Sequence, residues 1–517
     1  MRWSGRTLTA VVVVAATVLA ASTAGAVRTG ASSAVDKNGV LKYALDIPNA
    51  FGDNFDPASE VNDCSYAVSS LIFDTMVADG SNTTVSPGAA ASWDVDPTFT
   101  TITFHLRPGL TFSDGSPLNA DAVKQSLLDI KKSPLRTSLL AISAIDTPDP
   151  ATVILHLTKP VAGDVLWALT YEDGMLIAPS AIANAADKPV GSGPFTLSNY
   201  ETGQLISLKA NPKYRDASKY KLAGVDFVQV GAGPQAVTAL KSGQVDMIDL
   251  RPEDYPAVKA DPSLGISTSP SLDYTLIQLR QNEPPFDNPQ VREALEYAVN
   301  RNEINKVVYN GQNETASQPF PKFAAGYDKS LAKSYPYNPK KAKSMLTAAG
   351  FPNGVTFDMV IPSGEPTFER MAPLLQNEMQ RAGFTAKIDR VLGGDFFTDV
   401  YIKKQGQGIL SLALTNGPAL WSNFQGNFTP TGFVANALGS VNPQMTSLVA
   451  QAATSLDPKV SGPPMQQASA TVMSQGLEVP LVFEKRMVAY DKARVGGPPK
   501  APIGTCRSNL AGVYIKK

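Results

Sequence analysis

The sequence contains few of the residues that build catalytic and metal centres. It has two histidines and two cysteines in 517 residues. His105 and His156 are far apart in the chain and form no H-E-x-x-H motif, whereas a zinc site needs several ligands together. No G-x-S-x-G, P-loop or dinucleotide motif is present, and the S-x-x-K matches at 218–221 and 330–333 lack an S-D-N partner. The sequence therefore predicts no metal, no cofactor and no enzymatic activity.

Neither charge sign is in excess. Lysine and arginine total 45, and aspartate and glutamate total 46, which gives a formal net charge of −1. Proteins that bind nucleic acid carry a basic face, so no nucleic-acid partner is expected. A chain of 517 residues is too long for a single hydrophobic core, and two or three domains are expected.

Only one long hydrophobic run is present, at residues 8–21. Arg2 and Arg6 precede it, and Ala24-Gly25-Ala26 follows with the small side chains that a signal peptidase needs. This pattern predicts a signal peptide over residues 1–26, a mature chain that starts at Val27, and export to the periplasm or the cell surface. The alternative is an uncleaved N-terminal anchor. No cysteine lies near the cleavage point, so no lipobox and no lipid attachment are expected.

The two cysteines, Cys64 and Cys506, lie in the mature part of the chain. An exported protein meets an oxidising compartment, in which a pair of cysteines usually forms a disulfide. One Cys64–Cys506 disulfide is therefore predicted, and two buried free thiols are the alternative.

Hydrophobic periodicity and capping residues predict short strands and helices. Asn119 is expected to cap a helix over 120–130, and Asn288 and Asn338 each precede a proline at the first position of a helix. Another helix is expected from about residue 64 to 77. Strands are expected at 40–47, 101–106, 153–157, 274–279, 355–361, 385–391 and 409–414. From residue 271 onward, alternating strands and helices predict a mainly parallel sheet with helices on both faces.

Several short motifs follow one another along the chain. They are Phe55-Asp56-Pro57, Ala91-Ser92-Trp93, Phe104-His105-Leu106-Arg107-Pro108-Gly109, Phe112-Ser113-Asp114-Gly115, Gly191-Ser192-Gly193-Pro194-Phe195, Ser242-Gly243-Gln244-Val245-Asp246 and Pro285-Phe286-Asp287. With these motifs the sequence resembles the dipeptide- and oligopeptide-binding proteins, family 5 of the extracellular solute-binding proteins that serve ABC importers. The resemblance covers nearly all of the mature chain.

The resemblance implies an α/β, two-lobed periplasmic-binding-protein fold of type II (large cluster) with an extra inserted α+β subdomain. Lobe I would comprise residues 27–59, 176–267 and 487–517, the inserted subdomain residues 60–175, and lobe II residues 268–486. The chain would cross between the lobes near residues 271–274 and 483–490. A monomer would capture a small molecule or short oligomer between the lobes and deliver it to the membrane subunits of an ABC importer.

The resemblance places the ligand near the end of the strand at 409–414. Peptide-binding relatives carry an aspartate there that holds the α-amino group of the peptide, whereas this chain has no acidic residue between Val400 and Leu456. An ammonium group buried without a partner costs several kcal/mol. A neutral ligand rich in hydroxyl or amide groups, such as a short oligosaccharide, is therefore slightly favoured over a peptide. A peptide is the alternative, with Asp53 or Asp273 as the substitute acid.

The predicted ligand-binding residues surround this segment and the first strand. They are Asn54, Phe55, Tyr274, Thr415, Asn416, Gly417, Trp421, Asn423 and Phe424. Trp421 and Phe424 would offer flat apolar faces, and the two asparagines Asn416 and Asn423 would offer hydrogen-bond donors and acceptors. The alternative function is a secreted carbohydrate-active or peptide-hydrolysing enzyme. A glycosidase would need two carboxylates about 5–10 Å apart on facing strands.

Overall fold

A computed structural model of the protein describes seven stretches of the chain. These are residues 34–47, 54–59, 66–80, 84–133, 136–413, 419–497 and 509–517. The predicted signal peptide, Val27, Asp53, both cysteines Cys64 and Cys506, and the predicted ligand-binding residues Thr415, Asn416 and Gly417 lie outside the described residues. Within those stretches, no helix is both long enough and apolar enough to span a membrane.

One large mixed sheet runs through the molecule in the order β15-β14-β16-β12-β17-β11-β1-β10-β9-β8, with β13 paired to β17. Its strands are β1 (Val40–Leu45), β8 (Phe195–Glu201), β9 (Leu205–Ala210), β10 (Gly224–Gln229), β11 (Met247–Asp249), β12 (Leu264–Leu279), β13 (Glu314–Thr315), β14 (Val355–Ser363), β15 (Phe384–Leu392), β16 (Gly408–Ala413) and β17 (Glu478–Asp491). Strand β14 is parallel to β15 and β16, and β1 is parallel to β10 and β11. We call the side of the sheet that holds β1 and β8–β11 lobe I and the side that holds β14–β16 lobe II.

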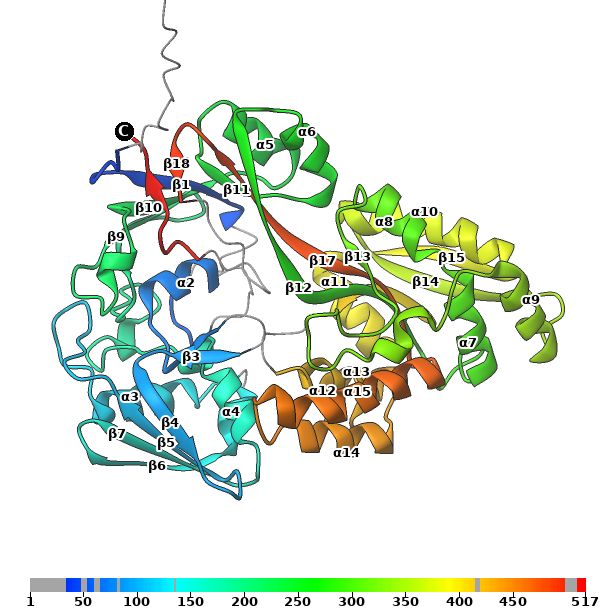
Figure 1. Ribbon diagram of the computed structural model, residues 1–517, viewed down its shortest axis with the longest axis horizontal. Coiled ribbons are helices and arrows are strands. Elements are labelled where there is room, and N and C mark those ends of the chain that lie inside the picture. The colour runs from blue at the N-terminus through cyan, green and yellow to red at the C-terminus, as the bar shows by residue number, and fades with distance from the viewer. Residues whose placement is uncertain are drawn as a thin grey trace, which may run out of the picture.

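The expectation of a mainly parallel sheet is wrong, because two long strands lie in its middle. Strand β12 has 16 residues and β17 has 14, and they run antiparallel to each other from one lobe to the other (Figure 1). At a rise of about 3.3 Å per residue, β12 is roughly 50 Å long. A chain that leaves lobe I and later returns to it runs in opposite directions on the two crossings, so these strands pair antiparallel with each other and with β11 and β16.

The inserted subdomain is built on a four-stranded sheet of order β4-β5-β7-β6. These strands are β4 (Ala90–Val95), β5 (Thr101–Leu106), β6 (Ile142–Asp149) and β7 (Thr152–Leu157), with helices α3 (Ala120–Ile130) and α4 (Ala162–Ala168) beside them and the short strands β2 (Val77–Asp79) and β3 (Val85–Pro87) nearby. Asn119 caps α3 as predicted, since its Oδ1 accepts a hydrogen bond from the Ala122 amide at 3.0 Å.

The helix expected over residues 64–77 is shorter than predicted. Helix α2 (Tyr66–Ile72) ends before Phe73, and Val77 begins strand β2. The backbone after α2 pairs with other segments, because the carbonyls of Ile72 and Asp74 accept hydrogen bonds from the amides of Gly193 and Leu176. These tertiary bonds take the place of the next helical turn.

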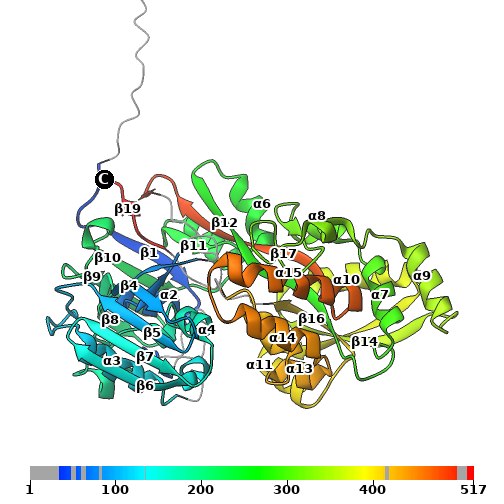
Figure 2. The same ribbon diagram turned by 60° about the horizontal axis from the view of Figure 1, so that its bottom comes forward.

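Helices cover both faces of the sheet in lobe II (Figure 2). They are α7 (Pro289–Ala298), α8 (Arg301–Val308), α9 (Pro339–Ala348), α10 (Pro366–Arg381), α11 (Gly393–Phe397), α12 (Ser422–Phe428), α13 (Phe433–Leu438), α14 (Pro443–Ala452) and α15 (Pro458–Gln475), while α5 (Pro234–Lys241) and α6 (Tyr255–Lys259) belong to lobe I. Asn288 and Asn338 cap α7 and α9 as predicted, with their Oδ1 atoms accepting from the amides of Gln290 and Lys341. The C-terminal residues form the small ladder of β18 (Val495–Gly496) and β19 (Tyr514–Ile515).

The hydrophobic core continues from lobe I into part of lobe II. One cluster of buried residues joins lobe I, the inserted subdomain and helices α12, α14 and α15, and it includes Phe104, Val165, Trp421 and Leu448. A second cluster lies between the lobe II strands and helices α7–α10 and includes Leu295 and Phe357. The lobes therefore meet at two places, along the crossing strands and again where α4 approaches α12 and α14 (Figures 1 and 2).

Candidate functional site

The ladder between the two crossing strands is interrupted near its middle. Pro270 lies opposite Lys485 and Tyr274 lies opposite Phe483, so the intervening segment is longer on β12 than on β17. Extra residues on one strand form a β-bulge, which bends the strand and turns its side chains in new directions. The bulge lies where the chain passes from one lobe to the other, so the sheet is least regular at this point.

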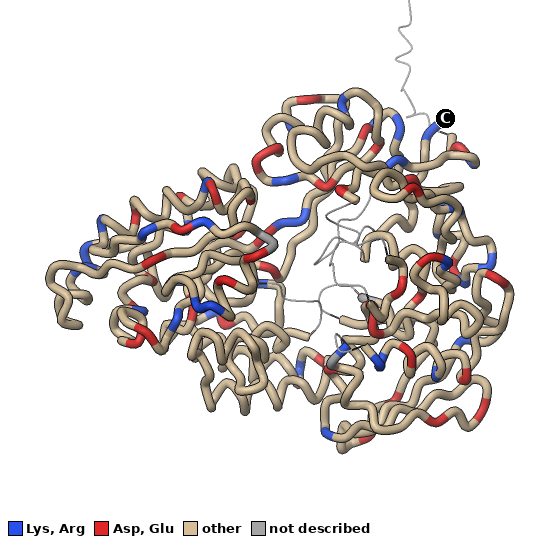
Figure 3. Tube along the Cα trace, turned by 180° about the vertical axis from the view of Figure 1, so that it is seen from behind, with Lys and Arg blue, Asp and Glu red and all other residues tan. Residues whose placement is uncertain are grey.

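Charged side chains gather at the bulge. Arg486 donates from Nη2 to Asp273 Oδ2 at 2.8 Å, and the side chain of Asp273 is 1% exposed while that of Arg486 is 30% exposed. Tyr43 donates its hydroxyl to Asp249, whose pKa is raised by burial although part of the residue remains accessible. Residues of both charge signs occur along the crossing strands (Figure 3). Around this point the three carboxylates of Asp249, Asp273 and Glu484 outnumber the two cations, Lys485 and Arg486.

Glu484 is one of two acidic residues, with Glu314, that line an open pocket at this position. The pocket has a volume of about 200 Å³, and its lining includes Ser271, Asn313, Phe323, Phe483 and Glu484. Burial raises the pKa of Glu484 to about 7, against the hydrogen bond that its Oε1 accepts from the Tyr309 hydroxyl at 2.7 Å. Both side-chain polar atoms of Asn313 are buried and have no hydrogen-bond partner among the described residues. The pocket thus combines the carboxylates of Glu314 and Glu484, the ammonium group of Lys485, an unpartnered amide and two aromatic rings.

A buried hydrogen-bond network lies beside the bulge in lobe II. Tyr274 is 0% exposed, and its hydroxyl donates to Glu478 and accepts from Asn423 Nδ2 at 3.2 Å. Asn423 Oδ1 in turn accepts from Asn427 Nδ2 at 2.6 Å. Burial raises the pKa of Glu478 to about 7. The polar groups of Tyr274 and Asn423 are therefore hydrogen-bonded within this network, to one another, to Glu478 and to Asn427.

The inserted subdomain and lobe II make a direct contact through Trp421 and Asp164. Trp421 is 0% exposed, and its Nε1 donates to Asp164 Oδ1, on α4, at 2.7 Å. Burial raises the pKa of the Asp164 carboxyl. The neighbouring Gly163 lets the backbones approach closely, since a Cβ atom there would lie 2.7 Å from the carbonyl oxygen of Ala453. The inserted subdomain and lobe II are thus packed against each other on the side away from the crossing strands.

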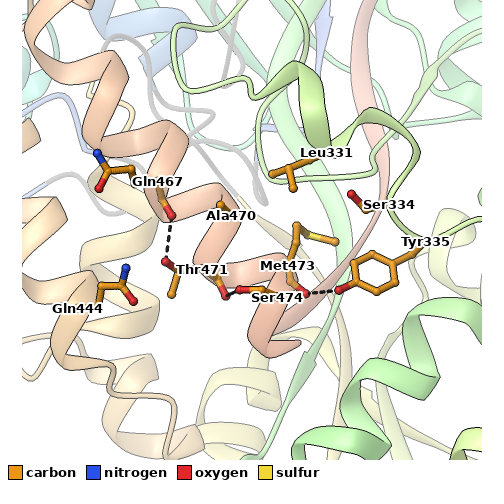
Figure 4. Close-up of a pocket in the computed structure, with 9 residues that line it drawn as sticks. All are labelled: Leu331, Ser334, Tyr335, Gln444, Gln467, Ala470, Thr471, Met473 and Ser474. Atoms are coloured by element: carbon orange, nitrogen blue, oxygen red, sulfur yellow. Dashed lines mark hydrogen bonds between the residues drawn. The ribbon is translucent and has the colours of Figure 1, made fainter.

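A further pocket lies within lobe II, between α15 and the segment at 331–335 (Figure 4). Its volume is about 410 Å³, and its lining is uncharged, with Tyr335, Gln444, Gln467, Thr471 and Ser474 among the residues. The Tyr335 hydroxyl donates to the carbonyl oxygen of Met473 at 2.8 Å. Because all of its lining comes from one lobe, it is not part of the opening at the crossing strands.

Comparison with known proteins identifies the family. Residues 84–436 match the family model described as bacterial extracellular solute-binding proteins, family 5 Middle, which spans more than half of the chain.

The chain belongs to family 5 of the bacterial extracellular solute-binding proteins.

Relatives of this family 5 protein align along most of their length. Glutathione-binding protein GsiB of Escherichia coli (strain K12) is 27% identical over 477 residues, which cover 88% of this chain and 92% of the relative. Among solved structures, DppA from Helicobacter pylori in complex with the peptide STSA has a TM-score of 0.76 at 23% identity and covers 93% of this chain and 98% of that one. CtaP from Listeria monocytogenes has a TM-score of 0.81 at 20% identity, with 93% and 100% covered. These matches confirm the predicted family and the two-lobed type II fold.

The predicted ligand-binding residues that the structure describes are occupied by contacts within the protein. Phe424 is 1% exposed and stacks on Phe320 at a ring-centroid distance of 5.2 Å. Phe55 is 1% exposed and packs edge-on against Tyr200. Asn54 donates to Ser59 Oγ at 2.7 Å within its own turn. Together with buried Trp421 and the Tyr274–Asn423 pair, they present no open aromatic face in this closed arrangement.

Asp273 was the substitute acid that the sequence suggested for a peptide ammonium. It is buried and paired with Arg486, so its charge is already balanced. Sequence reasoning missed Asp249, Glu484 and Arg486, because their proximity depends on strand register. One signal was available: Glu484-Lys485-Arg486 is a charged run inside the otherwise apolar stretch at 479–489.

Replacing Trp421 with phenylalanine removes the N–H group that donates a hydrogen bond to the buried Asp164 carboxylate. Hydrogen bonds to charged groups contribute about 1.5–3 kcal/mol, so the W421F variant should open more often. Small-angle scattering of the ligand-free protein should show a larger radius of gyration than for the wild type. The double variant W421F/D164N also removes the buried charge and should return toward the wild-type radius. Equal radii for all three proteins would contradict a closing role for this contact.

Glu478 should make the folded state more stable in acid than at neutral pH. Burial raises its pKa from 4.5 to about 7, so the folded protein binds this proton more tightly than the unfolded chain does. Stability from this group is fully present below about pH 4.5 and is lost as the pH rises through about 7. E478Q keeps an oxygen for Tyr274 and cannot ionise, so above pH 7 it should be more stable than the wild type by up to about 3 kcal/mol. Urea unfolding at pH 4.5 and pH 8 tests this, and a difference that is the same at both pH values would contradict it.

Proposed function

We propose that this family 5 protein is the exported solute-binding subunit of an ABC importer and holds its ligand between the lobes at the bulge of β12 and β17. The observation that carries the proposal is the exposure pattern of β17. Residues 479–483 and 487–489 are buried, whereas Glu484, Lys485 and Arg486 between them are partly exposed. A strand covered at both ends and open in the middle offers polar groups where two lobes can enclose a small molecule.

The charges at the bulge favour a ligand with a cationic amino group, such as a short peptide. Asp249, Asp273 and Glu484 lie with two cations, Arg486 and Lys485, and Arg486 is already paired with Asp273. An ammonium group beside Glu484 would supply the missing positive charge and would lower the pKa of that carboxyl again. The names and titles of relatives point the same way, since they include glutathione and the peptide STSA. Other relatives were solved with agropinic acid or a nickel–histidine complex.

A neutral oligosaccharide receives less support from the structure than from the sequence. The aromatic faces expected of Trp421 and Phe424 are buried, and Asn423 is bonded to Tyr274 and Asn427. The unpartnered amide of Asn313 is the group that favours such a ligand. Relatives of the chain are named as binding proteins, so the proposed role is binding without turnover rather than glycoside or peptide hydrolysis.

We also propose that the protein is exported and acts as a soluble monomer. The predicted signal peptide over residues 1–26, cleavage before Val27 and the absence of a lipobox cysteine support a periplasmic or cell-surface protein without a lipid anchor. The importer's membrane subunits would then be its protein partners.

Calorimetric titration with dipeptides and oligosaccharides tests the ligand class. Free-amine dipeptides should bind, and E484Q should weaken their binding by about tenfold or more, which corresponds to about 1.4 kcal/mol. N-acetylated dipeptides should bind weakly to both proteins. E201Q, at an exposed glutamate in β8 outside the pocket, is the matched control and should bind like the wild type. Tight binding of an oligosaccharide together with unchanged dipeptide affinity in E484Q would contradict the amino-group assignment.

A Cys64–Cys506 disulfide should be present in the exported protein. In the chain-entropy model, a bridge across so long a stretch of chain could stabilise the fold by about 6 kcal/mol through the entropy of the unfolded state. Thiol labelling after denaturation without reductant should find no free thiol, and labelling after reduction should find both. Two labelled thiols in the unreduced protein would rule out the bridge.

A further inference from the structure

A pocket of about 370 Å³ lies at the junction of lobe I and the inserted subdomain. Its lining comes from two parts of the chain, residues 74–118 and 192–216, and no residue of lobe II contributes. It is therefore separate from the opening at the crossing strands. The family motifs at 104–109 and 191–195 each supply one of its polar residues, Arg107 and Ser192.

The acidic residues of this pocket are already neutralised by one arginine. Arg215 donates to both oxygens of Asp74, from Nε at 2.6 Å and from Nη2 at 3.2 Å. Its third nitrogen, Nη1, donates to Asp216 Oδ2 at 2.6 Å. A guanidinium group that bridges two carboxylates in this way satisfies them with directed, charge-assisted bonds. Neither Asp74 nor Asp216 then needs the other cations of the pocket.

Three hydrogen-bond donors in the same pocket remain without strong acceptors. Arg107 uses Nε on the carbonyl of Gly88 at 2.8 Å, and its two terminal nitrogens have no partner in the described part of the chain. Lys213 Nζ makes a long contact of 3.4 Å with the Ser113 carbonyl. Ser192 is 6% exposed, and its hydroxyl has no partner among the described residues.

Local backbone geometry brings these donors together. The Arg107-Pro108-Gly109 turn ends β5 with Gly109 at a φ of +70°, and no atom of the described residues lies within 4 Å of a Cβ atom placed there. At Gly115, by contrast, a Cβ atom would lie 2.7 Å from Lys213 Nζ, so the glycine leaves room for the ammonium group.

We propose that this pocket binds a small oxyanion, with a carboxylate, sulfate or phosphate as the recognised group. The guanidinium fork of Arg107 can donate to two oxygens at once, and Lys213 adds a second positive charge. An oxyanion would also give the Ser192 hydroxyl the acceptor it lacks, and leaving a buried hydroxyl unsatisfied is unfavourable. With Arg215 bridging both carboxylates, the pocket carries one positive charge in excess, which such an anion balances.

Thermal unfolding of the full-length mature protein in sulfate, phosphate and acetate, at constant ionic strength set with sodium chloride, tests the site. At least one of the three anions should raise the melting temperature in a saturable manner, and the anion that does so identifies the recognised group. The double variant R107Q/K213Q should weaken its apparent affinity by tenfold or more, and K213Q or S192A alone should weaken it less.

K209Q is the matched control, because Lys209 is an exposed lysine of β9 outside the pocket; it should leave the affinity unchanged. Lys213 is exposed, so the K213Q variant should fold normally. It therefore still tests the site if substitution of Arg107 perturbs folding. No saturable shift beyond chloride, or the same shift in K213Q, S192A and the wild type, would overturn the proposal. None of these residues lines the pocket at Glu484, so the dipeptide titrations can succeed or fail independently.

Discussion

The antiparallel pairing of β12 with β17 is the contact on which the rest of the structure depends. Strand β17 is bonded to β11 of lobe I, strand β12 is bonded to β16 of lobe II, and the two strands are bonded to each other on both sides of the bulge. A continuous ladder of backbone hydrogen bonds resists bending, and a bulge is where such a ladder gives way. We therefore expect the two lobes to move relative to each other at the break between Pro270 and Tyr274.

The same break explains why charged residues lie at the centre of the molecule. Helices and neighbouring strands cover β17 at both ends, and apolar side chains fill those parts of it. Between the lobes none of the described elements covers the strand fully, so Glu484, Lys485 and Arg486 keep accessible surface. A buried carboxylate such as Asp273 is stable there because it is paired, since an isolated buried charge is strongly unfavourable. The Trp421–Asp164 contact closes the opposite side with one directed bond and close backbone packing.

Features set by neighbouring residues could be predicted from the sequence, and features set by distant pairing could not. Asn119, Asn288 and Asn338 cap the predicted helices because an N-cap needs only the next turn of chain. Strand β5 lies at 101–106 as its alternation predicted. The first part of β12 was missed because Ser267-Thr268-Ser269-Pro270 lacks an apolar alternation, and its pairing with β17 fixes its conformation instead.

At the candidate site, too, local features could be predicted from the sequence and features set by distant pairing could not. Trp421 is an aromatic residue in the region where the resemblance placed the ligand, but the approach of α4 buries it, and nothing in the local sequence shows that approach. Asp249 and Arg486 are 237 positions apart in the chain. They come close only because β11 and β17 are neighbours in the sheet order β12-β17-β11. The family could be recognised from short motifs, whereas the residues that face the opening depend on the register of the whole sheet.

A distance measurement between the lobes tests the central claim most directly. Spin labels introduced as noncanonical residues at the exposed positions Gln125 on α3 and Gln451 on α14 report the separation of the inserted subdomain from lobe II by pulsed dipolar spectroscopy. Motion about the bulge predicts a single short distance with bound ligand, taken as the tightest-binding dipeptide, and an added longer distance without it. Identical distance distributions with and without saturating ligand would contradict a hinge at the crossing strands.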